Sequence, residues 1–240
     1  MSRASSNRSD RPPISSRLQR ALSAVVAADA SVPSGELLAW LGQPLDLHSA
    51  SELARVLAAA PPPATQEHRN TVGACEDCEE ALLTVRGGLL RDIARSFAAA
   101  EGALIPLPRL DAPSVLDGPD AAERLRRFHA AWQREMELRI HALRRDLRSC
   151  LQQQAPGLGA LAALDEALEQ QVLRAGESVL VSLPALLVPR WETLVADTAD
   201  AAASELLVSE LRELLLAELE QRLQPALGLV EACVVYGNKD

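Results

Sequence analysis

Two cysteines, Cys75 and Cys78, stand three positions apart and form the one motif of this sequence with a chemical character. Thiols at this spacing can bind zinc or act as a redox pair. A zinc site needs about four ligands. No second pair of this kind occurs, so His68 is the nearest third ligand, and Cys150 and Cys233 would have to come from elsewhere in space. The candidate metal ligands are therefore Cys75, Cys78 and His68.

The neighbours of this pair favour a structural role. Four carboxylates adjoin the cysteines: Glu76, Asp77, Glu79 and Glu80. Negative charge raises the pKa of a thiol and opposes its reactivity, whereas acidic residues in the first turns of a helix stabilise its positive end. A thioredoxin-type site would follow a strand, of which there is no sign. We expect structural cysteines and no cofactor, with zinc binding and redox chemistry as alternatives.

No other residues form a catalytic pattern. The histidines are scattered: His48, His68, His129 and His141. We expect all four at the surface or in loops. The neighbouring carboxylates Asp165–Glu166 and Glu218–Glu220 are expected to be solvated charges on helix faces. Nucleophile-elbow, phosphate-loop and dinucleotide-binding signatures do not occur. The sequence thus predicts a protein without catalysis of its own.

A run of arginines offers a different chemistry. Residues 120–155 hold eight: Arg124, Arg126, Arg127, Arg134, Arg139, Arg144, Arg145 and Arg148. Helical spacing lets Arg127, Arg134 and Arg145 line one edge. The structural interpretation is pairing with acids of the same helix and of the acidic C-terminal helices. The functional interpretation is that the arginines bind an acidic partner or a nucleic-acid backbone. The candidate partner-binding residues are then Arg124, Arg127, Arg134 and Arg145.

The elements that must position these side chains are predicted to be long helices. Of 240 residues, 48% are hydrophobic and only 2% aromatic. Leu and Ala dominate, β-branched residues are scarce, and no stretch alternates for long. Apolar residues recur every three or four positions along three segments, about 74–100, 120–155 and 203–223. The fold class is therefore all-α, an elongated bundle of long antiparallel helices or a coiled coil.

The apolar stripes predict which face of each helix is buried. The first comprises Cys78, Leu82, Val85, Leu89, Ile93 and Phe97, and contains Gly87–Gly88 as a weak point. The second comprises Leu125, Phe128, Trp132, Met136, Ile140, Leu143, Leu147 and Cys150. Between the second and third stripes, a helix carrying Leu161, Leu164, Leu168 and Val172 should bend or end near Pro184 or Pro189. Pro225 should kink or restart the last helix. Helices this long often need a partner to cover them, which favours a homodimer or docking on another helical protein.

The chain divides into four predicted parts. Residues 1–13 are a disordered basic tail, 14–60 a small helical unit, 61–73 a linker and 74–240 the long-helix bundle. The first helix should start near Ser15 or Ser16 and bury Leu18 and Leu22. No run approaches the roughly 18 apolar residues of a membrane span, and the weak apolar run 21–28 does not suit a signal peptide. We expect a cytoplasmic protein, and the net charge of −9 argues against a general nucleic-acid coat.

Several Leu-rich segments resemble domain-of-unknown-function family 3348, a proteobacterial family. They are residues 37–42, 45–47 and 51–53 near the start, and residues 183–187 and 215–229 toward the end. The resemblance implies a genomic neighbourhood rather than a reaction. Members lie beside MotA/TolQ/ExbB-type proton-channel proteins and their OmpA-like partners, an arrangement similar to a type III Zorya anti-phage defence system. No catalytic residues come with it, and Cys75 and Cys78 are not part of its pattern.

The favoured function is a helical interaction or scaffold protein. It would dock through its long helices, for example on the cytoplasmic coiled-coil tail of an ion-driven membrane complex, with apolar burial for affinity and charged edges for register. The second hypothesis is a nucleic-acid-binding accessory protein that uses the Arg-rich helix 120–155. A third is a zinc or redox protein acting through Cys75 and Cys78.

Overall fold

The computed structural model describes residues 17, 18, 20–22, 71–98, 100–108, 120–154, 156–175, 179–196 and 201–237. The described part of the chain is almost entirely helical and contains no strand, which confirms the all-α fold. Most of the predicted N-terminal unit and linker lie outside these residues. None of the described helices is long and apolar enough to cross a membrane.

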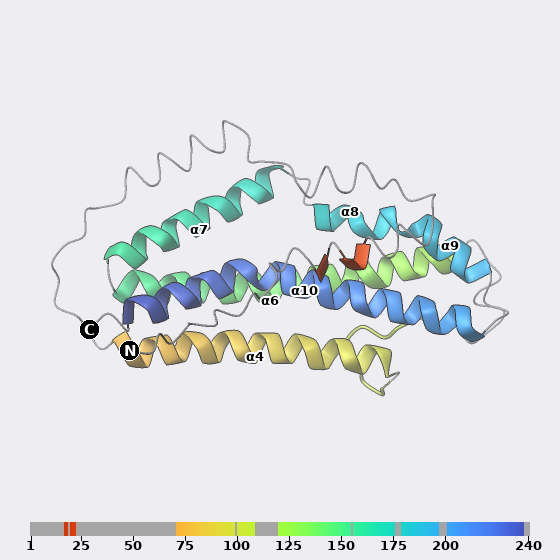
Figure 1. Cartoon of the computed structure of the whole chain (residues 1–240), viewed down its shortest axis with the longest axis horizontal. Helices are drawn as coiled ribbons and strands as arrows, with labels where there is room; N and C mark the ends of the chain where they lie inside the picture. The colour runs from red at the N-terminus through yellow and green to blue at the C-terminus, as the bar shows by residue number, and fades with distance from the viewer. Residues whose placement is uncertain are drawn as a thin grey trace, which may run out of the picture.

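Within the described residues after Leu22, six helices follow one another: α4 (Thr71–Phe97), α6 (Asp120–Gln154), α7 (Pro156–Ala175), α8 (Val179–Leu186), α9 (Val188–Ala196) and α10 (Ala201–Gly237). The chain reverses direction after α4, after α6 and after α9 (Figure 1). Helices α7, α8 and α9 run in succession the same way and together form one column of the bundle (Figure 1). The result is an elongated antiparallel bundle of four columns.

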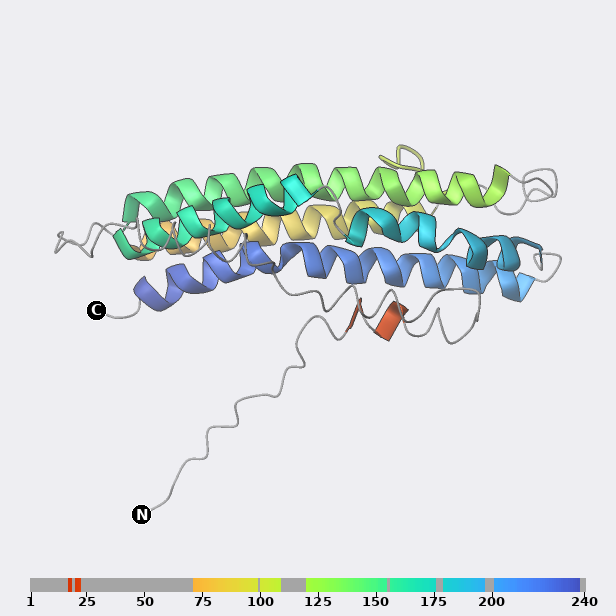
Figure 2. The ribbon, with the colours of Figure 1, turned by 90° about the horizontal axis from the view of Figure 1, so that it is seen from above.

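Helices α6 and α10 form the middle of this bundle. Helix α4 packs on both from one side, and α7, α8 and α9 pack on α6 from the other (Figures 1 and 2). The predicted stripes point inward: Leu89 and Ile93 of α4, Trp132 and Met136 of α6, and Leu211 of α10 are all fully buried. The stripes therefore cover one another within a single chain. Any partner must be sought on the outer faces.

The third column differs from the prediction in two ways. Leu161, Leu164 and Leu168 are only half-buried, while Leu158 and Ala162 face the core. The column also consists of three separate helices, with α7 ending at Ala175 and α8 beginning at Val179, while the change from α8 to α9 after Leu186 agrees with the bend or end predicted near Pro184 or Pro189. From α8 to α9 the backbone bonding continues, because the amides of Leu187 and Trp191 donate four residues back to Leu183 and Leu187.

Helix α10 is longer than the periodicity indicated. It extends to Gly237 with Pro225 inside it, so the chain does not restart at Pro225, and the predicted kink is the alternative that fits. The proline ring is exposed, and the Gln224 side chain donates to the Glu220 carbonyl one turn earlier. The C-terminal part of α10 bends (Figure 2). Gly87 and Gly88 likewise lie inside an unbroken α4.

The first described residues pack against α10. Leu18 and Leu22 are buried in the same core as the bundle helices. Arg17 pairs with Glu213 (3.1 Å) and with Glu220, which lie on α10 two turns apart. The start of the predicted N-terminal unit is therefore fastened to the bundle by both apolar and charged contacts.

Candidate functional site

One edge of α6 stays uncovered when the bundle closes. Arg127, Arg134, Leu138 and Arg145 are exposed, and their spacings of seven, four and seven residues place them along one line of the helix. Leu138 is 67% exposed, the highest value among the large hydrophobic residues of the described part. This α6 edge, defined by these four residues, combines three guanidinium groups with an apolar centre.

The guanidinium groups of the α6 edge are held only weakly. Arg127 Nε contacts Glu123 Oε1 (2.9 Å) one turn before it, and Arg145 contacts the adjacent Asp146 (3.1 Å). Arg134 makes no ion pair within the described residues. Hydrogen bonds from Arg126 and Arg127 lower the pKa of Glu123 to about 2, so this carboxylate stays charged. Exposed pairs of this kind add little stability, so a partner's carboxylate can replace them at small cost.

The other arginines of α6 serve the bundle, as the structural interpretation predicted. Arg139 Nη1 contacts Asp92 (2.7 Å) and thereby joins α6 to α4, while its Nε contacts Glu135 (2.6 Å). Arg126 pairs with Glu123 (2.6 Å). Arg124 is half-buried and does not lie on the α6 edge. Of the four candidate partner-binding residues, the structure thus leaves three on one exposed edge.

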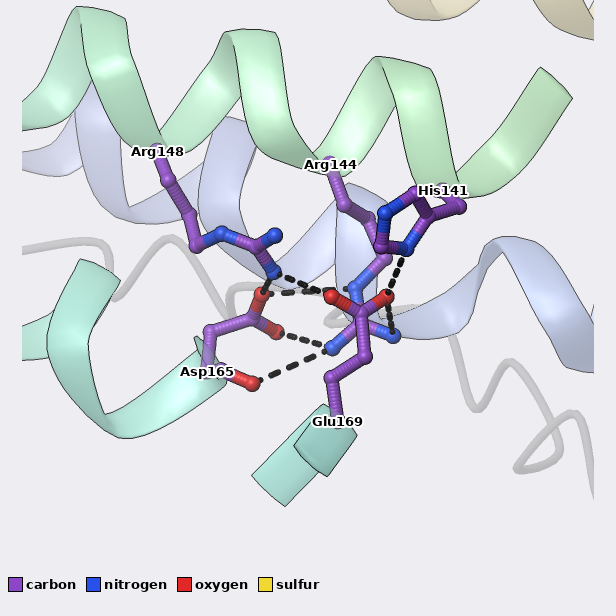
Figure 3. Close-up of polar contacts among 5 residues, drawn as sticks. All are labelled: His141, Arg144, Arg148, Asp165 and Glu169. Carbon is purple, nitrogen blue, oxygen red and sulfur yellow. Dashed lines mark hydrogen bonds and ion pairs between the residues drawn. The ribbon is translucent and has the colours of Figure 1, made fainter. Parts of the chain in front are cut away.

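A cluster of charges joins α6 to α7 (Figure 3). Arg144 contacts Asp165 (2.8 Å) and Glu169 (2.9 Å), and Arg148 contacts the same two carboxylates (2.9 and 2.8 Å). His141 reaches Glu169 from the rim (3.3 Å). The two arginines and two carboxylates are each at most 13% exposed. The expectation that Asp165 is solvated is wrong, because α7 turns this face toward α6, whereas Glu166 is exposed.

A second polar group lies deep in the core. His129 Nε2 lies 2.8 Å from Glu218 Oε2, and both side chains are fully buried. Burial acts to raise the pKa of Glu218, but His129 and Arg222 outweigh it and lower this pKa, with Arg222 Nε donating at 2.9 Å. An ionised carboxylate only accepts, so Nε2 donates. Trp191 packs beside the imidazole (6.0 Å between ring centres).

The surface positions predicted for His129 and Glu218 are therefore wrong. The spacing of these residues along their helices did indicate that they are buried. His129 stands three residues before Trp132, and Glu218 continues the spacing of Leu211, Leu214 and Leu215, so both fall within the apolar stripes. Their polar character suggested solvent, whereas the two stripes face each other and His129 Nε2 and Glu218 Oε2 pair across them, with His129 Nδ1 left without a hydrogen-bond partner among the described residues. This pairing depends on how α6 and α10 are placed side by side.

Three cysteines from three helices meet near one end of the bundle. Gln154 donates to Cys150 Sγ (3.2 Å) and accepts from Cys233 Sγ (3.1 Å). Burial first, and then the adjacent Cys150 and Cys233 thiols, raise the pKa of Cys78 well above its usual value. All three are free thiols. The raised pKa leaves Cys78 protonated and unreactive.

The predicted metal ligands are not assembled by the described residues. Cys78 is buried, His68 lies outside the described part of the chain, and Cys75 lies in α4 with its side chain outside the description. Within the described ranges, no group of three or more His, Cys, Asp or Glu side chains is arranged to hold a metal ion. Sequence reasoning paired Cys78 with Cys75, and missed its packing against the thiols of α6 and α10.

The fold and these sites define an all-α bundle protein with a few polar groups buried in an apolar core and an exposed basic edge on α6. The chain belongs to the family described as "Protein of unknown function (DUF3348)", whose family model matches residues 4–234. This match confirms the resemblance seen in the Leu-rich segments. No curated protein and no solved structure matches the chain.

Proposed function

We propose that this protein is a helical interaction protein, and that its α6 edge binds an acidic amphipathic helix of a partner protein. The observation that carries the proposal is the exposure of Leu138 among three outward guanidinium groups. A leucine with this exposure gains from burial roughly 1.5–3 kcal/mol. Arginine is also the side chain best suited to bidentate carboxylate binding.

The spacing of the edge favours a helical ligand. Arg134 and Leu138 are one turn apart, and Arg127 and Arg145 each lie two turns beyond. A helix laid along α6 can place an apolar residue on Leu138 and carboxylates one or two turns to either side. Affinity then comes from apolar burial and register from the charged pairs.

Nucleic acid fits this surface less well. Five of the eight arginines of α6 are half-buried or buried, which leaves three exposed guanidinium groups. Glu137 and Asp146 are exposed beside them, and they would repel phosphate. Since each neutralised phosphate contributes to affinity, a surface with so few free cations binds a backbone weakly. Nucleic acid remains the second candidate, and the test below includes it.

We further propose that the partner belongs to an ion-channel-linked anti-phage defence system, in which this protein is an accessory component. Family membership supports this part, through the neighbourhood of proton-channel proteins that the family resemblance implies. The helical tail of such a complex is the kind of ligand that the α6 edge would take. Binding to a channel-associated helix, with no bond made or broken, is the mechanism.

The test measures binding of labelled probes to the full-length protein by fluorescence anisotropy. The probes are an amphipathic peptide helix with leucines flanked by glutamates, the same peptide with lysines in place of glutamates, and DNA as duplex and single strand. We expect the acidic peptide to bind best, and the charge-reversing variant R134E or the variant L138D to weaken it about tenfold or more, which is about 1.4 kcal/mol.

The matched control is L206D, which changes another exposed leucine, on α10. It should leave peptide binding unchanged. Equal binding of the acidic and basic peptides, or equal binding by wild type and L138D, would overturn the proposal. Tight binding of DNA at physiological salt that is lost in R134E would establish the nucleic-acid function instead.

A further inference from the structure

The outer face of α4 carries apolar residues that the described part of the chain leaves exposed. Leu83 is 54% exposed and Leu90 is 36% exposed, and they stand two turns apart on one side of the helix. Gly87 lies between them, and Ala94 continues the line as an exposed residue. A Cβ added at Gly87 would meet nothing within 4 Å. We call this line of residues (Leu83, Gly87, Leu90 and Ala94) the α4 seam. It has no side chain at its centre, where Gly87 lies.

Gly87 lowers the stability of helix α4 itself. Glycine in a helix interior loses about 1 kcal/mol relative to alanine. Gly88 faces α6, where an added Cβ would lie 3.7 Å from Arg139 Nη1. Among the described residues, Gly87 has no neighbour that requires the absence of a side chain. A glycine flanked by leucines lets a second helix approach closely.

The charges along this face change sign at its middle. Asp77, Glu79 and Glu80 are exposed in the first half, Arg91 and Arg95 in the second, and Arg86 at the middle. Asp92, which has the opposite sign to its neighbours, turns away and pairs with Arg139. The face is therefore acidic at one end and basic at the other, with the α4 seam running through both halves.

From this pattern we propose that the α4 seam binds the α4 seam of a second copy of this chain, with the two helices antiparallel around a two-fold axis close to Gly87. A ligand helix of uniform charge would match only one half of the face. A parallel copy would place carboxylates on carboxylates. The antiparallel copy places the acidic half of each helix against the basic half of the other.

The spacings satisfy the two-fold symmetry. An axis between residues 86 and 87 places Leu83 of one copy against Leu90 of the other. The same axis brings Glu80 near Arg91 and Asp77 near Arg95 of the second copy. By helical rotation, Asp77 and Arg95 lie five turns apart on one flank of α4, and Glu80 and Arg91 lie about three turns apart on that same flank. Apolar and charged contacts thus form together.

This inference is independent of the α6 edge, since it concerns a different helix face and a different ligand. The experiment is sedimentation velocity of the full-length protein over a concentration range that reaches tens of micromolar. Wild type should dimerise, and the single variant L83R should remain monomeric over the whole range. L206R on α10 should dimerise as wild type does. Circular dichroism should give equal helix content for all three, because every changed residue is exposed.

Charge exchange tests the antiparallel orientation. The double variant D77R/E80R should weaken dimerisation about tenfold or more, and adding R91D/R95D in the same chain should restore it, because all the pairs are then reversed together. Restoration together with loss in L83R supports the proposal. A protein that stays monomeric at every concentration would overturn the proposal. A dimer insensitive to L83R would also overturn it, and so would four charge changes that do not restore dimerisation.

Discussion

At the residue scale, the most constrained groups are polar side chains held inside an apolar bundle. Glu218 has no exposed surface and keeps its charge through His129 and Arg222. A buried carboxylate without such contacts would lose far more free energy of solvation than it recovers from the surrounding apolar side chains. The position therefore tolerates loss of one partner poorly, which gives a clear prediction.

The substitution Glu218→Gln should lower the free energy of unfolding by about 3 kcal/mol, because it leaves the Arg222 guanidinium without its counter-charge and removes the carboxylate that His129 Nε2 contacts. Urea unfolding followed by circular dichroism measures this. Glu231→Gln is the matched control, since Glu231 is an exposed glutamate on the same helix. A loss no larger than that of the control would show that the buried pair adds nothing.

The same carboxylate predicts a pH dependence. The pKa of Glu218 is lowered in the folded protein, so its stabilising contribution is complete above the unfolded-state value of about 4.3. That contribution is lost as the pH falls through the folded-state pKa, because the folded state must then take up a proton. Between about pH 5 and pH 2, wild-type stability should fall more steeply than that of Glu218→Gln. Parallel curves would contradict this assignment.

Sequence reasoning placed the core leucines and aromatics of α4, α6 and α10 correctly, but not the inward face of α7 or the buried polar residues. Leu125, Trp132 and Leu211 were predictable because apolar periodicity depends on one helix at a time. His129 and Glu218 were not, because their burial requires two helices in one relative placement. The contacts of Cys78 with Cys150 and Cys233 were not predicted for the same reason, since they join helices far apart in the sequence.

At the element scale, α7 depends on charged contacts more than the other helices do. Its outermost leucines are half-buried, and Arg144 and Arg148 hold it through Asp165 and Glu169. The third column was predicted as one helix because the leucine spacing continues into it. The end of α7 at Ala175 and the turn of Asp165 toward α6 are tertiary features that this spacing does not contain.

Replacing Asp165 by Asn should therefore loosen α7. Each arginine loses one charged partner, and we expect a loss of about 2–3 kcal/mol of stability. Amide hydrogen exchange within α7 should accelerate more than exchange within α4. The neighbouring variant Glu166→Gln, at an exposed position, should leave both rates as in wild type. Equal acceleration in α4 and α7 would mean that the cluster does not act locally.

Helix α4 carries a second element-scale prediction. The variant Gly87→Ala should raise the free energy of unfolding by about 1 kcal/mol, because alanine favours the helix and its Cβ meets no atom within 4 Å. Thermal unfolding at low concentration, where α4–α4 pairing is absent, measures the effect. A destabilised variant would show that the open space above Gly87 is occupied in solution.

At the scale of the whole molecule, the bundle covers its own apolar stripes and leaves function to its outer faces. Few aromatics and many leucines and alanines suit close packing of long helices, and Phe97, Phe128 and Trp132 all lie on the inward stripes. The outer faces carry two distinct surfaces, the α6 edge and the α4 seam. The first is basic around one leucine and the second is charged with opposite signs at its two ends.

The central claim is that the α6 edge binds a partner protein. Its most direct test is quantitative mass spectrometry of proteins that co-purify, from the native cells, with tagged wild type, with the double variant R134E/L138D and with the control L206D. We predict a protein with an acidic amphipathic helix that is retained by wild type and by L206D and lost from R134E/L138D. The same proteins at the same yields with all three baits would contradict the claim.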